Sequence, residues 1–77
     1  MPVLTDDQST VIKALMVEGA TPAERTEAAL RDRTGLAHVG RILRELENNF
    51  DLPLVANDLD ATLGTKVWWA TPVVADL

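Results

Sequence analysis

Apolar side chains in the first fifty residues recur at steps of three and four, which is the spacing of one face of a helix. The first stretch predicts a helix over about 6–18, because Thr5 and Gln8 form a capping box at its start and Gly19 provides a stop. A second helix is predicted over about 22–34, where a threonine cap is followed by proline at the first helical position. Both starts are signalled locally in the sequence.

A third helix, predicted over about 37–50, has the clearest two-sided pattern. Its apolar stripe consists of Val39, Ile42, Leu43, Leu46 and Phe50. The opposite side is polar and aligns His38, Arg41, Glu45 and Asn48. The pattern predicts a helix that buries one side and exposes the other.

After Phe50 the pattern changes from a helical period to that of strands. Residues 52–56 and 65–70 predict two short strands because they are rich in apolar, β-branched and aromatic side chains. The segment 57–64 between them is polar and ends in glycine, so it predicts a long loop. Together these segments predict a hairpin at the end of the chain.

Two adjacent tryptophans lie in the second predicted strand, and side chains alternate across a strand. Since Val67 shares a face with Trp69, we expect Trp69 to enter the core. Trp68 would then face outward, where it could anchor a contact with a protein partner. The alternative is that Trp68 folds over Leu4, Leu77 or another residue near a terminus.

The composition is that of a soluble domain, with 47% hydrophobic and 25% charged residues in 77 positions. We expect a single domain over residues 1–77 with a modest core, which dimerisation would help to stabilise. The absence of cysteine excludes disulfides and thiolate metal sites. The apolar runs are too short for a membrane span, and residues 1–8 lack the pattern of a secretory signal. We therefore expect a cytoplasmic protein, complete from its own Met1.

Charge is distributed unevenly along this acidic chain, whose formal net charge is -5. Residues 31–44 are basic, with four arginines and one aspartate. A localised positive face suits a domain that meets a polyanion, whereas the alternative is an ordinary solvated helix face. The acidic balance of the whole is consistent with a high-salt interior and equally with a protein partner.

Three short stretches resemble winged helix-turn-helix regulators of bacteria and archaea. VGRILRELE at 39–47 resembles their recognition helix, RTGL at 33–36 their turn, and WWATP at 68–72 the return strand of their wing. The resemblance covers roughly residues 5–72 and implies an α+β fold, with three helices and a C-terminal two-stranded β-hairpin wing. The turn before the third helix is shorter than is usual in the family, and the wing carries two aspartates, Asp58 and Asp60.

The resemblance also implies that the third helix lies in the major groove of DNA. Its exposed positions would be His38, Gly40, Arg41 and Arg44. Arg41 is the foremost candidate, because its fork can address guanine O6 and N7 together; the alternative is an ion pair with Glu45. Backbone phosphates would be contacted by Arg31, Arg33 and Arg44, and Lys66 is the only basic residue of the wing.

The sequence thus predicts a small sequence-specific DNA-binding transcription regulator that acts as a homodimer on double-stranded DNA. The alternative is a winged-helix module for protein–protein interaction, an adaptor or inhibitor with an acidic surface and no DNA binding. We expect no enzyme activity and no cofactor, because a phosphate loop, a cysteine and an acid pair beside a nucleophile are all missing. Asn57, Asp58 and Asp60 resemble a fragment of a calcium loop but lack its glycine and glutamate, so we expect no metal site.

Overall fold

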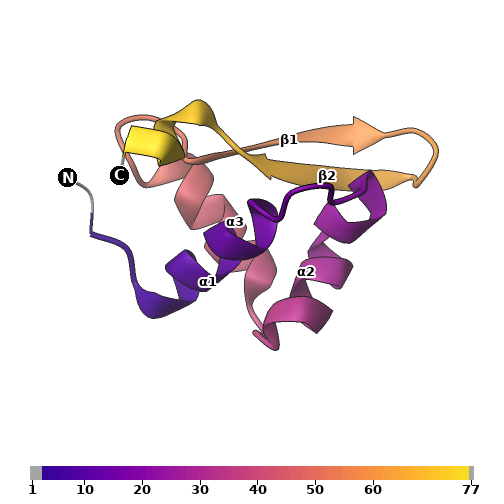
Figure 1. Ribbon diagram of the computed structural model, residues 1–77, viewed down its shortest axis with the longest axis horizontal. Coiled ribbons are helices and arrows are strands. Elements are labelled where there is room, and N and C mark those ends of the chain that lie inside the picture. The colour runs from indigo at the N-terminus through magenta and orange to yellow at the C-terminus, as the bar shows by residue number, and fades with distance from the viewer. Residues whose placement is uncertain (1–2, 77) are drawn as a thin grey trace.

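The computed structural model describes residues 3–76, with side chains described through Ala75. This part of the chain forms three α-helices followed by a two-stranded antiparallel hairpin, so the expected α+β class and element order are confirmed. The elements are α1 (Asp6–Leu15), η1 (Pro22–Arg25), α2 (Glu27–Thr34), α3 (Val39–Asn48), β1 (Val55–Asp60), β2 (Thr65–Ala70) and η2 (Pro72–Asp76), where η marks a 3-10 helix. The hairpin extends over the helices, with α3 beneath it (Figure 1). This arrangement is compatible with a winged helix.

The predicted capping box starts α1. The Gln8 backbone N–H donates to the Thr5 hydroxyl at 3.1 Å, and the Thr5 N–H donates to the Gln8 side chain at 3.0 Å. The helix ends at Leu15, three residues before the predicted end at 18. Met16 and Val17 are exposed, so no buried face extends the helix beyond Leu15.

The predicted second helix is divided, and the single helix over 22–34 is therefore wrong. Thr26 has an extended backbone, with φ -80° and ψ 160°, and separates η1 from α2. It pairs with Val67 of β2 through an isolated antiparallel bridge. Its hydroxyl also accepts the Ala29 N–H at 3.2 Å and so caps α2. Thr26 thus joins the hairpin to the helices.

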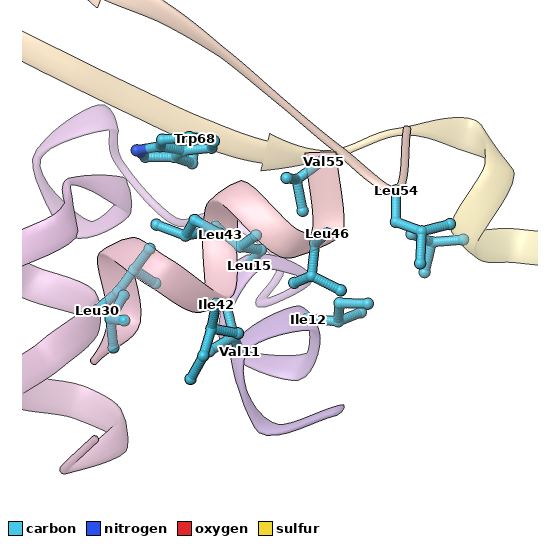
Figure 2. Packing of buried hydrophobic residues seen from close by; sticks show 12 residues of the cluster. Val11, Ile12, Leu15, Leu30, Ile42, Leu43, Leu46, Leu54, Val55 and Trp68 are labelled. Atoms are coloured by element: carbon cyan, nitrogen blue, oxygen red, sulfur yellow. The ribbon is translucent and has the colours of Figure 1, made fainter. Parts of the chain in front are cut away.

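The apolar stripe of α3 forms the centre of the core. Val39, Ile42, Leu43 and Leu46 are buried and pack with residues of α1, α2 and the hairpin (Figure 2). The helix covers Val39–Asn48 and is thus shorter at both ends than the predicted 37–50. None of the helices in residues 3–76 is long and apolar enough to cross a membrane.

The hairpin has a longer first strand and a shorter loop than predicted. β1 begins at Val55, and residues 57–60 of the expected loop are paired with β2, from Asn57 opposite Trp68 to Asp60 opposite Thr65. Asp60 ends the strand: its carboxylate accepts the N–H groups of Thr62 and Leu63, and its carbonyl accepts that of Gly64. Side-chain and backbone bonds of one aspartate therefore close a turn of four residues.

The tryptophans occupy the opposite of their predicted positions. Trp68 is buried, with 6% of its surface exposed, whereas 37% of Trp69 is exposed. Residues directly opposite in an antiparallel pair share a face, and Trp68 lies on the face that also carries the fully buried Val55. Figure 2 shows Trp68 and Val55 pointing from the hairpin toward α3. The prediction that Trp68 anchors a protein contact is wrong, because its side chain belongs to the core.

Candidate nucleic-acid interface

The exposed side of α3 carries two arginines. Arg41 and Arg44 are exposed, as is Asn48 one turn further on, whereas four residues of the opposite side are buried. Within residues 3–75 neither arginine forms an ion pair, so the alternative in which Glu45 pairs with Arg41 is not realised. The core thus fixes the helix, and its outer side presents two cations to solvent.

Arg44 and Lys66 line one groove, which lies between α2, α3 and β2. The groove has a volume of about 260 Å³ and is lined by Glu27, Arg44, Glu47, Asn48, Thr65, Lys66 and Trp68. The hairpin therefore brings its lysine to the edge of the predicted reading helix. The same groove contains two carboxylates, so its charge is mixed.

Each of the two carboxylates in this groove is held by a neighbouring side chain. The Asn57 side-chain amide donates to the Glu47 carboxylate at 2.6 Å, which ties α3 to β1. Arg31 donates to the Glu27 carboxylate at 3.4 Å within α2. These contacts satisfy part of the hydrogen-bonding capacity of both acids, and Arg44 and Lys66 have neither as an ion-pair partner.

Arg31 and Arg33 do not join Arg41 on one continuous basic ridge. They are two residues apart on α2 and therefore point to different sides of the helix. Arg31 pairs with Glu27, and Arg33 approaches Glu24 of η1 at 3.9 Å. Since both pairs are well exposed to solvent, each contributes at most about 1 kcal/mol to stability. Glu27 of α2 and Glu24 of η1 thus offset much of the positive charge of these two arginines.

Glu24 is also held by the start of η1. The backbone N–H of Thr21 donates to its carboxylate at 3.2 Å and the Thr21 hydroxyl at 3.1 Å. These two bonds lower the pKa of Glu24 below its ordinary value of 4.5, and the Arg33 cation adds to the effect. Glu24 is therefore ionised near neutral pH and stays available to Arg33.

Gly40 lies at a contact between helices. A Cβ built on Gly40 would approach the Glu27 carboxylate and come within 2.8 Å of its Cδ. The prediction that Gly40 lies on the open face of the third helix is wrong, because Gly40 is half-buried beside the Glu27 side chain of α2. His38 fits the prediction better: it is exposed at the N-cap position of α3, and its side chain makes no capping hydrogen bond.

Sequence reasoning missed the two glutamates that meet the arginines. The spacing of four residues from Glu27 to Arg31 is a recognised signal for an ion pair on a helix. The Glu24–Arg33 contact carries no such signal, because it depends on the break between η1 and α2 at Thr26. No group of three or more His, Asp or Glu side chains within the described residues is placed to hold a metal ion.

Comparison with family models, with curated proteins and with solved structures finds no match to this chain.

Proposed function

We propose that this protein is a small winged-helix DNA-binding regulator of transcription, with α3 as the element that enters the major groove. One observation carries the proposal: α3 is buried along one side and presents Arg41 and Arg44 without carboxylate partners on the other. An α-helix fits the major groove of B-DNA, and a helix fixed by its core side can place side chains there reproducibly.

The individual residues have different roles in this proposal. Arg41 addresses a base edge, with guanine as the preferred target because it offers two acceptors to the guanidinium fork. Arg44 and Lys66, which share a groove, contact backbone phosphate, as does His38 in its protonated form. Arg31 lies at the margin of this surface, and Arg33 is outside it.

The proposed regulator binds DNA as a homodimer. A single copy presents few cations, and helix-turn-helix proteins commonly bind two half-sites about one helical turn apart. Two copies would double the number of phosphate contacts made to one duplex.

The test measures binding to a random-sequence duplex by fluorescence anisotropy, at a low and at a moderate salt concentration. We expect binding that weakens with salt. Arg41→Ala should weaken binding to a selected duplex about tenfold and reduce its preference over random sequence. Arg44→Ala should reduce the slope of log K against log salt by about one per copy. Arg33→Ala is the matched control and should bind like the unmodified protein. Undetectable binding at low salt would overturn the proposal.

A protein-interaction module is the second candidate, and the hairpin favours it. Leu59 is 65% exposed in β1 and has an aspartate on each side in the sequence, Asp58 and Asp60. Alternation along the strand places Leu59 on the face of Trp68 and both aspartates on the opposite face. An exposed leucine on one face and two acids on the other suit contact with a protein better than contact with DNA. This candidate predicts no duplex binding at low salt, and capture of a partner that Leu59→Ser abolishes and Arg41→Ala leaves intact.

A further inference from the structure

A second groove lies where the base of the hairpin meets the end of α1, and its lining differs in character from the first. It has a volume of about 370 Å³ and includes Leu15, Met16, Arg25, Trp69, Pro72 and Val74 in its lining. It shares no lining residue with the groove of Arg44 and Lys66. Most of its wall is apolar, and Arg25 is the one charged side chain among the described residues that line it.

Arg25 has no partner within the described residues. Its Nε is shielded from solvent and has no hydrogen-bond acceptor, although the side chain as a whole is only partly buried. No carboxylate of residues 3–75 forms an ion pair with it. A shielded donor without an acceptor costs about 1–3 kcal/mol, and a carboxylate is the strongest partner for a guanidinium. The Arg25 guanidinium therefore has hydrogen-bonding capacity that no described residue satisfies at Nε.

The apolar lining indicates that a ligand of this groove also has an apolar part. Trp69 and Met16 line the same groove as Arg25 and are 37% and 56% exposed. Small-molecule sites are typically mostly apolar, with a few polar groups that fix orientation, and their volumes begin at about 300 Å³. An inorganic anion would leave these apolar side chains in water, and a neutral apolar molecule would leave Arg25 without an acceptor.

We propose that this groove binds a small carboxylate with an apolar body, about the size of 3-phenylpropionate. The carboxylate accepts from the Arg25 guanidinium, and the apolar body covers Trp69 and Met16. This site goes beyond the proposed DNA binding and does not require it, because the two grooves use different residues.

The chain offers a direct readout, since its two tryptophans lie in different environments. In the ¹⁵N-labelled full chain, the indole N–H signals of Trp68 and Trp69 are assigned with a Trp69→Phe variant, which removes one of them. Titration with 3-phenylpropionate should shift the Trp69 indole and Arg25 Nε–H signals to saturation and leave the Trp68 signal in place. The neutral 3-phenylpropionamide should bind about tenfold more weakly, because it offers no charge-assisted hydrogen bond. Acetate, which lacks the apolar body, should not saturate either signal.

Variants locate the site. Arg25→Gln should weaken 3-phenylpropionate binding about tenfold. Arg33→Gln is the matched control on an arginine outside the groove, and it should leave binding unchanged. Equal binding of acid and amide, or saturation of neither signal, would overturn the proposal in the unmodified protein, whatever the stability of the variants. Because the titration contains no DNA, its failure is separate from failure of duplex binding.

Discussion

Trp68 and Trp69 are neighbours in the sequence but lie on opposite faces of the hairpin. Trp68 lies on the inner face with Val55, against α3, whereas Trp69 lies on the outer face with Val67 and lines the groove of Arg25. The alternation of a strand requires the two side chains to differ, but it does not determine which one is buried. The register with β1 determines it, because Val55 directs the inner face to the core.

Val67 gave a misleading signal for a physical reason. It is apolar and half-buried, and Thr26, between η1 and α2, pairs with it along the edge of β2 that β1 leaves free. Pairing at this edge therefore shields Val67 without placing it in the core. Apolar residues thus occur on both faces of β2, and a simple inside–outside assignment from the sequence fails.

The largest difference in stability is expected between variants that replace the two tryptophans. Trp68→Ala should lower the free energy of unfolding by about 3–5 kcal/mol, because it leaves a cavity against α3. Trp69→Ala should lower it by about 1 kcal/mol or less, since the side chain keeps contact with solvent. Urea denaturation followed by circular dichroism measures both, and Trp68→Phe is the milder variant if Trp68→Ala does not fold. Equal losses would show that the two faces are equally covered.

Glu47 tests the polar part of the inner face. Its carboxylate accepts from Asn57, which lies directly opposite Trp68 in the hairpin. Glu47→Ala should cost about 1–2 kcal/mol, because the bond is charge-assisted and partly buried. Glu45→Ala, on the same helix, should cost no more than about 0.5 kcal/mol. In a double-mutant cycle with Asn57→Ala, the double variant should lose less stability than the sum of the two single losses. Full additivity would contradict a direct coupling.

Thr26 tests the contact at the free edge of β2. Thr26→Ala should cost about 1 kcal/mol in urea denaturation, because α2 loses the hydroxyl that accepts the Ala29 N–H. Thr26→Ser keeps that acceptor and should retain most of the stability. If serine and alanine were equally destabilising, the methyl group beside Val67 rather than the cap would be the important contribution.

The smallest effect concerns pH and the start of η1. The pKa of Glu24 is lowered in the folded state, so its contribution to stability is present above the ordinary value of 4.5 and is lost as the pH falls through the lower folded pKa. Glu24→Gln should therefore reduce stability at neutral pH and make less difference in acid. Urea midpoints of both proteins across this range should converge at low pH, and a constant separation would contradict the lowered pKa.

Local signals predicted much of the fold. The Thr5 cap, the buried stripe of α3 and the second strand at 65–70 were all predicted from short stretches of sequence, and the structure confirms them. The break at Thr26 depends on a bridge to Val67, forty-one positions away, and no local pattern records such pairing. The extent of β1 likewise depends on pairing with β2.

In the candidate site, too, local features could be predicted from the sequence and contacts between elements could not. Exposure of Arg41 and Arg44 follows from helical period alone, and the structure confirms it. The covering of Gly40 by Glu27 and the approach of Glu24 to Arg33 depend on how the helices meet. The run of arginines in the sequence therefore overstated the basic surface, because folding brings Glu24 and Glu27 next to it.

One edge of β1 bears on how this protein behaves when crowded with copies of itself. Within the described residues β1 pairs with β2 alone, so its other edge leaves backbone donors and acceptors open to a strand from another chain. Asp58 and Asp60 lie along that strand, and a second copy arriving edge to edge would bring its own aspartates. Mutual repulsion at such an edge is a known safeguard against sheet-to-sheet aggregation, and here it lets the hairpin project from the helices without inviting fibril growth.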